Sequence, residues 1–135
     1  MMIIKFVVPG EPRAKARPRI STKTGIAYTP KGTIQYENWV KTCFMEQDGK
    51  KIDGQISAKI TAYYSIPKST SKKKREEMLQ GKIRPVKKPD VDNIVKSILD
   101  SLNKIAYDDD SQVVKCDVEK FYDDNPRVEV ELKND

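Results

Sequence analysis

The sequence contains no histidine, only two cysteines and no long apolar run. Without histidine, the chain cannot build a Ser-His-Asp or Cys-His centre, a histidine general base or one of the usual zinc sites. Cys43 and Cys116 lie far apart in the sequence, which predicts two buried or half-buried thiols rather than a disulfide framework. Any catalysis must therefore depend on carboxylates, lysines, hydroxyls and bound metal.

Membrane and secretion signals are also absent. No apolar stretch approaches the ~18 residues that a membrane-spanning helix needs. The N-terminal stretch MMIIKFVVPGEP is too short and too soon charged for a signal peptide. These absences predict a cytoplasmic protein with no membrane partner. The length of 135 residues fits a single domain, 1–135, that can bury a core of its own.

Acidic residues are scarce in the first part of the chain. Residues 1–85 hold 18 Lys and Arg against 7 Asp and Glu, whereas residues 86–135 hold 8 against 13. The basic part favours contact with phosphates, and the acidic part favours the binding of cations. Solvated surfaces would give the same composition, so charge alone does not decide the function.

Hydrophobic periodicity predicts an α+β fold, with a mixed β-sheet and helices packed on it. Strands are predicted over residues 2–8, 55–66, 112–122 and 127–132. Helices are predicted over residues 31–48 and 91–104, together with a short helix that is capped by Ser69, Thr70 or Ser71 and reaches Leu79. A hairpin is predicted over residues 19–29. The last two strands are expected to pair with each other as an antiparallel hairpin, because a short polar turn joins them.

The two longer helices carry apolar stripes that predict their buried faces. For the helix over 31–48, the stripe consists of Ile34, Trp39, Val40, Cys43 and Phe44. For the helix over 91–104, it consists of Ile94, Val95, Ile98, Leu99, Leu102 and Ile105. The opposite side of the second helix is polar, so this side is expected to face something other than the core.

The most informative stretch is KKPDVDNIVKSILDSLN, residues 87–103. Asp90 and Asp92 stand two residues apart in an extended or cap-like segment, which would point both carboxylates to one side. Unpaired, each anion disfavours ionisation of the other. A Mg²⁺ ion removes this conflict, because it prefers oxygen ligands and typically takes one or two carboxylates; Mn²⁺ is the expected substitute.

Further polar residues follow this pair. Lys96 lies one helical turn after Asp92, where it forms an ordinary surface ion pair or stabilises negative charge on a phosphoryl group. The YDDDSQ loop then supplies Asp108, Asp109 and Asp110. A carboxylate from this loop that returned to the first pair would complete a three-ligand Mg²⁺ site for phosphodiester hydrolysis. A solvated turn would explain the same loop.

The stretch KPDVDNIVKSILDSLN, followed by AYDDDSQVV, resembles the RusA-type Holliday junction resolvases. The family pattern is roughly K/R-x-D-[LIV]-D-N-[LIV]-x-K-x-x-x-D-[AS]-L, a loop, and D-D-[AS]-Q-[VI]-V. Similarity to the branch found in Gram-positive bacteria and their phages covers most of the chain. The resemblance implies a RusA-like fold and an Mg²⁺-dependent endodeoxyribonuclease of DNA recombination and repair. It also implies a homodimer that resolves four-way junctions by paired symmetric nicks.

The resemblance also implies roles for individual residues. The metal ligands would be Asp90, Asp92 and Asp110, and the essential lysine would be Lys96. Asp108 adds an aspartate before the usual pair, so Asp108 or Asp109 could share the ligand role. Further accessory candidates are Asn93 and Asp100.

Basic residues predict where DNA would bind, because phosphates dominate the contacts of DNA-binding proteins. Four of them alternate along a proline-stiffened arm. The predicted DNA-binding residues are Arg13, Lys15, Arg17, Arg19, Lys72, Lys73, Lys74, Arg75, Lys87 and Lys88. Trp39 and the first helix are candidates for dimer contacts.

Three other functions fit parts of this sequence. One is a less selective nuclease that cuts branched DNA of several kinds, and another is a non-catalytic DNA-binding protein. A sugar-nucleotide enzyme that uses Asp-x-Asp is disfavoured, because no other nucleotide-binding signature accompanies the pair.

Overall fold

The structure is a computed structural model that describes residues 1–15 and 19–134. Its elements are β1 (Ile3–Pro9), β2 (Arg19–Ile20), β3 (Ala27–Tyr28), α1 (Lys31–Gln47), β4 (Ile56–Ser65), α2 (Lys72–Leu79), α3 (Val91–Leu102), the 3₁₀ turn η1 (Asp110–Gln112), β5 (Val113–Asp123) and β6 (Arg127–Asn134). Arg17, one of the predicted DNA-binding residues, lies outside the described residues. None of the described helices has the length and apolar character needed to span a bilayer.

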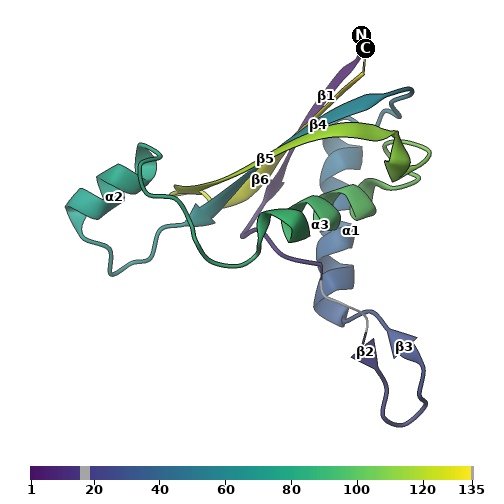
Figure 1. The fold of residues 1–135 in the computed structure, drawn as a ribbon, viewed down its shortest axis with the longest axis horizontal. Coiled ribbons are helices and arrows are strands. Elements are labelled where there is room, and N and C mark those ends of the chain that lie inside the picture. The colour runs from purple at the N-terminus through teal and green to yellow at the C-terminus, as the bar shows by residue number, and fades with distance from the viewer. Residues whose placement is uncertain (16–18, 135) are drawn as a thin grey trace.

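The main sheet has the strand order β1-β6-β4-β5 (Figure 1). β6 pairs antiparallel with both β1 and β4, whereas β5 pairs parallel with β4. The prediction that β5 and β6 form a hairpin with each other is therefore wrong. The short turn after Asp123 instead passes the end of β4, so β4 has a hydrogen-bonded neighbour on each side.

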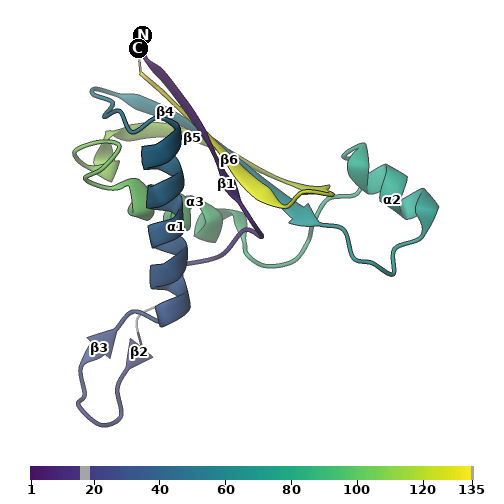
Figure 2. The same cartoon turned by 180° about the vertical axis from the view of Figure 1, so that it is seen from behind.

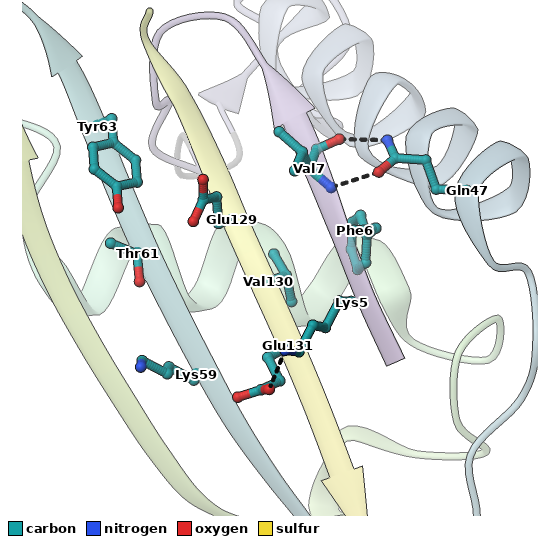
Figure 3. A pocket seen from close by; sticks show the side chains of 10 residues that line it. All are labelled: Lys5, Phe6, Val7, Gln47, Lys59, Thr61, Tyr63, Glu129, Val130 and Glu131. Carbon is teal, nitrogen blue, oxygen red and sulfur yellow. Dashed lines mark hydrogen bonds and ion pairs between the residues drawn. The ribbon is translucent and has the colours of Figure 1, made fainter. Parts of the chain in front are cut away.

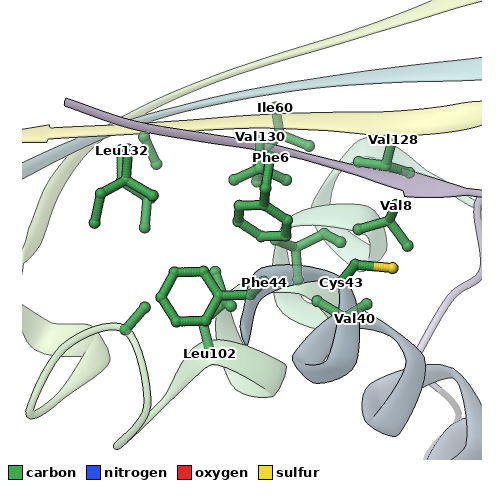
Figure 4. Packing of buried hydrophobic residues seen from close by; sticks show 14 of the residues in the cluster. Phe6, Val8, Val40, Cys43, Phe44, Ile60, Leu102, Val128, Val130 and Leu132 are labelled. Atoms are coloured by element: carbon green, nitrogen blue, oxygen red, sulfur yellow. The ribbon is translucent and has the colours of Figure 1, made fainter. Parts of the chain in front are cut away.

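Helices α1 and α3 pack on one face of this sheet, as both cartoon views show (Figures 1 and 2). Strands β1, β4 and β6 alternate buried and exposed residues, which places one row of apolar side chains against the helices. Phe6 and Phe44 meet edge-on between the layers, with ring centroids 5.4 Å apart (Figure 4). The architecture confirms the predicted mixed α+β fold.

The buried face of α1 differs from its predicted stripe. Thr33 and Tyr36 are buried, whereas Ile34 and Trp39 are 45% and 42% exposed. The Trp39 indole N–H donates to the carbonyl of Pro9 at 2.7 Å. Tertiary position overrides periodicity here, because α1 also covers the open edge of β1 and uses polar side-chain atoms to satisfy that strand's backbone.

Two elements extend away from the body of the protein. The β2–β3 hairpin projects beyond the start of α1, and α2 projects beyond the far end of the sheet (Figures 1 and 2). α2 begins at Ser71, whose hydroxyl accepts a hydrogen bond from the Lys74 N–H at 3.3 Å, and it buries no residue. The segment after α2 is held to the sheet by Arg84, whose guanidinium lies 4.0 Å from the centre of the Phe121 ring.

Candidate active site

Asp90 and Asp92 lie at the beginning of α3. Asp90 is the residue before the first helical turn, with an extended backbone (φ −72°, ψ 160°), and Asp92 lies within that turn. Both residues are exposed, and the Asp90 side chain makes no capping hydrogen bond. Neither carboxylate has a partner among the described residues, and both lie at a helix end whose partial positive charge favours anions. Asp90 thus occupies the cap position and Asp92 the first turn, which corresponds to the cap-like form of the predicted segment and not to a fully extended one.

The turn that carries Asp90 is positioned by two residues that sequence reasoning missed. The buried Tyr64 hydroxyl donates to the carbonyl of Pro89 at 2.6 Å. Burial raises the pKa of Tyr64 well above its usual range, so it remains a donor at neutral pH. The Lys120 ammonium donates to the carbonyl of Lys87 at 2.5 Å. An inward-facing tyrosine at the end of the predicted strand was the available signal, because a buried tyrosine hydroxyl usually needs a partner.

A hollow of about 390 Å³ opens beside this turn. It is lined by Pro12, Arg13, Ala14, Pro30, Gly32, Thr33, Lys88 and Pro89. Two of the predicted DNA-binding cations, Arg13 and Lys88, thus line this hollow. Another lining residue, Pro89, directly precedes Asp90 in the sequence. A concave surface with two cations beside unpaired carboxylates can accept an anionic group close to a bound cation.

Asp110 does not join Asp90 and Asp92 in this chain. Its backbone N–H donates to the Asn103 side chain at 3.1 Å, which places it at the opposite end of α3. The 12 residues of α3 span about 18 Å at 1.5 Å per residue. Within residues 1–15 and 19–134, no three acidic or cysteine side chains lie close enough together to hold one metal ion. A single chain therefore does not form the three-ligand site that the sequence predicted.

The other three aspartates of this region are paired with lysines. Asp100 accepts a hydrogen bond from the Lys15 ammonium at 2.8 Å. Asp108 contacts Lys51 at 2.5 Å, and Asp109 lies 3.6 Å from Lys104. Each of these three carboxylates thus has a basic partner within its own chain.

The ion pairs also shift pKa values. The hydrogen bond and charge of Asp100, with a smaller contribution from Glu37, raise the pKa of Lys15 despite partial burial. Hydrogen bonding to Lys51 lowers the pKa of Asp108. The pKa of Asp109 is lowered mainly by hydrogen bonds from Ser111, because Asp109 caps η1.

The carboxylates of Asp90, Asp92 and Asp110 contrast with these pairs. Among the described residues, none of the three has an ion pair or a side-chain hydrogen bond, and the same holds for the Lys96 ammonium. The surface ion pair that the spacing of Asp92 and Lys96 allows is thus not formed. Asn93, the residue that follows Asp92, is half-buried. The charges of the four residues with a role implied by the resemblance thus have no partner among the described residues.

The predicted DNA-binding cations fall into two groups. Arg13, Arg19, Lys72, Lys73, Lys74, Lys87 and Lys88 are exposed. Lys15 is instead held between Asp100 and Glu37, and Arg75 forms an ion pair with Asp124. The alternation along the arm did not indicate this difference, because the partners of Lys15 come from distant parts of the chain.

A second hollow, of about 470 Å³, lies on the sheet face that the helices leave open (Figure 3). Its charged side chains include the matched pair Lys5 and Glu131 at 3.4 Å. Gln47 closes one side by bonding both backbone groups of Val7, at 2.8 and 2.6 Å. None of the predicted site residues lines this hollow.

The comparison with protein families agrees with the resemblance carried by the block around Asp90. The family described as Endodeoxyribonuclease RusA matches residues 9–133, so the chain belongs to the RusA family. It is 42% identical to the protein YqaN of Bacillus subtilis (strain 168), described as uncharacterized, over 98% of this chain and 97% of that protein. It is also 29% identical to the crossover junction endodeoxyribonuclease rusA of Lactococcus phage r1t, over 78% of this chain and 75% of that protein.

Proposed function

We propose that this protein is a divalent-metal-dependent endodeoxyribonuclease that resolves four-way DNA junctions by paired, symmetric nicks. Membership of the RusA family and the similarity to the phage crossover junction endodeoxyribonuclease support the reaction and the substrate. The single observation that carries the assignment of the site is that Asp90, Asp92 and Lys96 remain unpaired on an exposed helix start. Exposed carboxylates and an exposed ammonium without partners are available to a bound cation and to a phosphate.

The donor set at the start of α3 fits Mg²⁺, because both side chains supply hard oxygen ligands and the ion usually retains several waters. Asp90 and Asp92 would hold the ion, with Mn²⁺ as the expected substitute. Such an ion supplies a nucleophilic water and stabilises charge on the phosphate. Lys96 would stabilise the negative charge that develops on the phosphate, and Arg13 and Lys88 would orient the DNA strand in the adjacent hollow.

The separation of Asp110 from Asp90 within one chain suggests a dimer in which the two copies share their metal sites. If Asp110 is the third ligand, it must come from a second copy of the chain, since one helix length separates the two ends of α3. A two-fold axis that pairs two α3 helices in opposite directions would bring Asp110 of each copy to Asp90 of the other. The homodimer would then be required for both metal sites, as well as for the two symmetric cuts.

The reaction can be tested with a labelled synthetic four-way junction and a linear duplex that has the same arm sequences. Each is incubated with Mg²⁺ or with EDTA, using the wild type and the variant Asp90→Asn. We expect paired nicks at symmetric positions, only on the junction and only with both metal and Asp90. Equal cutting of both substrates would indicate a less selective branched-DNA nuclease. Tight binding without cutting under any metal would indicate a DNA-binding protein.

The dimer can be tested by mixing two inactive variants. Asp90→Asn and Asp110→Asn chains are refolded separately and together, and nicking of the junction is measured. In a mixed dimer with shared sites, one site carries both substitutions and the other is intact, so nicking of one strand should return. If all three ligands came from the same chain, every site in the mixture would be defective. Absence of recovery would therefore refute the shared site without refuting the role of Asp90.

A further inference from the structure

The β2–β3 hairpin is a small ribbon whose turn is closed by local hydrogen bonds. Arg19 pairs with Tyr28 and Ile20 with Ala27. The turn is closed by a hydrogen bond from the Gly25 N–H to the Ser21 carbonyl at 2.8 Å, and Gly25 adopts a positive φ of 71°. The Ser21 hydroxyl also accepts hydrogen bonds from the backbone at Lys23 and Thr24. The tip is thus shaped by its own backbone, and the ribbon projects away from the sheet (Figures 1 and 2).

This ribbon exposes large apolar side chains. Ile20 is 70% exposed, Ile26 is 67% exposed and Tyr28 is 49% exposed. A two-stranded ribbon has little stability of its own in water. Three such side chains on one projecting element are more than the scattered apolar residues of an ordinary surface, and they indicate a surface that a partner covers.

The charge around the ribbon restricts the chemistry of that partner. Residues 12–36 contain no Asp or Glu, and Arg13, Arg19, Lys23 and Lys31 of this stretch are exposed, whereas Lys15 is paired with Asp100 and Glu37. Arg19 and Lys23 lie on the ribbon itself and are exposed. A partner that fits this surface combines negative charge with accessible apolar area. Nucleic acid has both where bases are unstacked, since each base offers a π-face beside the phosphate backbone.

We propose that the apolar side chains of the β2–β3 hairpin pack against the base-pair faces that become accessible at the branch point of a DNA junction. This inference rests on the proposed function for its substrate class. Apolar side chains that insert at base steps are a known means of stabilising unstacked DNA. Arg19 and Lys23 would hold the neighbouring phosphates. The hairpin would thus distinguish a junction from linear duplex, which keeps its base faces stacked, while the cations would add affinity for both.

The test compares an apolar variant, Ile20→Ser with Ile26→Ser, with a charge variant, Arg19→Gln with Lys23→Gln. Met45→Ser is the matched control, because Met45 is 57% exposed and lies near the other end of α1. Binding to a junction and to a duplex of the same arm sequences is measured by fluorescence anisotropy in EDTA, so the result does not depend on cleavage. Thermal unfolding of each variant verifies the fold.

We expect the apolar variant to lose about 10-fold or more in affinity for the junction and less than about twofold for the duplex. The charge variant should lose affinity for both substrates and show a weaker dependence on salt. Met45→Ser should change neither affinity. The fluorescence of 2-aminopurine placed at the branch point should rise on binding of the wild type and rise less with the apolar variant.

Several outcomes would overturn the inference. Equal losses on junction and duplex would make the hairpin a general DNA arm, and unchanged affinities would exclude it from binding. A shift of the apolar variant from dimer to monomer would assign the surface to a second copy of the chain. Binding to anionic phosphatidylglycerol vesicles that the apolar variant loses, with junction affinity intact, would assign it to a lipid surface. If the wild type binds junctions selectively and never cuts them, the proposed nuclease activity fails while this inference stands.

Discussion

Among the residues that the structure describes, six aspartates between positions 90 and 110 form two groups with opposite surroundings. Asp90, Asp92 and Asp110 have free carboxylates, whereas the second group, Asp100, Asp108 and Asp109, is paired with Lys15, Lys51 and Lys104. In the sequence the second group lies between members of the first, and Asp109 and Asp110, one from each group, are adjacent. The difference shows that acidic residues of one region can be divided between structure and chemistry by the position of a lysine. Proximity along the chain does not predict the role.

The largest expected effect is a difference in cleavage rate between a variant of the first group and a variant of the second. Asp92→Asn should lower junction cleavage by more than about 100-fold, because it removes a ligand from the metal site. Its stability should change little, since the loss of repulsion with Asp90 is offset by the loss of a favourable negative charge at the helix start. Asp108→Asn is the matched control and should cleave at the wild-type rate. Single-turnover rates and thermal unfolding midpoints test the pair, and equal rates for both variants would remove the distinction between the groups.

The next effect concerns the free lysine beside the free carboxylates. Lys96→Met should lower the cleavage rate about 100-fold, because a cation that stabilises transition-state charge is lost. Junction affinity in EDTA should change by less than about threefold, since a single surface cation adds little to binding. Lys115→Met, which alters an exposed lysine 3.7 Å from Asp117, is the control. A loss of affinity as large as the loss of rate would make Lys96 a DNA-binding residue only.

A smaller effect is expected from the paired group, and it is on stability. Asp100→Asn should lower the free energy of unfolding by about 1–2 kcal/mol, because it removes a hydrogen bond between charged groups. The raised pKa of Lys15 means that the pair stabilises the fold fully below the unfolded lysine pKa of about 10.4, and less as pH rises above it. Urea unfolding at pH 8 and at increasing pH above 10 should show the difference between variant and wild type shrinking. A difference independent of pH would contradict this assignment.

The smallest effect is expected at Asp108, which is exposed beside Lys51. The pKa of Asp108 is lowered in the folded state, so its pair stabilises the fold above the ordinary aspartate pKa of about 3.9 and is lost as pH falls through the lower folded value. Asp108→Asn should shift the thermal midpoint slightly at pH 7 and not at pH 2. A shift larger than that of Asp100→Asn would reverse the order of the two pairs.

Much of the local structure is predictable from short stretches. The amphipathic pattern after Asp90 predicts α3, and the observed helix ends only two residues before the predicted end. The Lys-Thr-Gly turn predicts the β2–β3 hairpin, and Ser71 is the observed cap of α2. Each of these features depends on interactions between residues that are close together in the sequence, so the sequence alone is enough to predict it.

The strand order and the pairing of charges were not predictable in this way. A short turn between β5 and β6 suggested a hairpin, but β4 lies between the two strands. Lys15 looked like one more cation of a DNA-binding arm until its partner Asp100 was found 85 residues away. The sequence pattern of a strand shows which of its faces is buried, but not which strand pairs with it. In the same way, the alternation of cations along the arm does not show which carboxylate pairs with Lys15.

The sequence by itself determined the chemistry that this protein can use. Its lack of histidine leaves metal, carboxylate and lysine, and the spacing of Asp90, Asp92 and Lys96 at a helix start follows from local propensity. Only the tertiary structure decided which charges stay free and that Asp110 lies a helix length from Asp90. The physical reason is that an ion pair or a metal site requires contact within a few ångströms, and packing of distant segments sets such contacts.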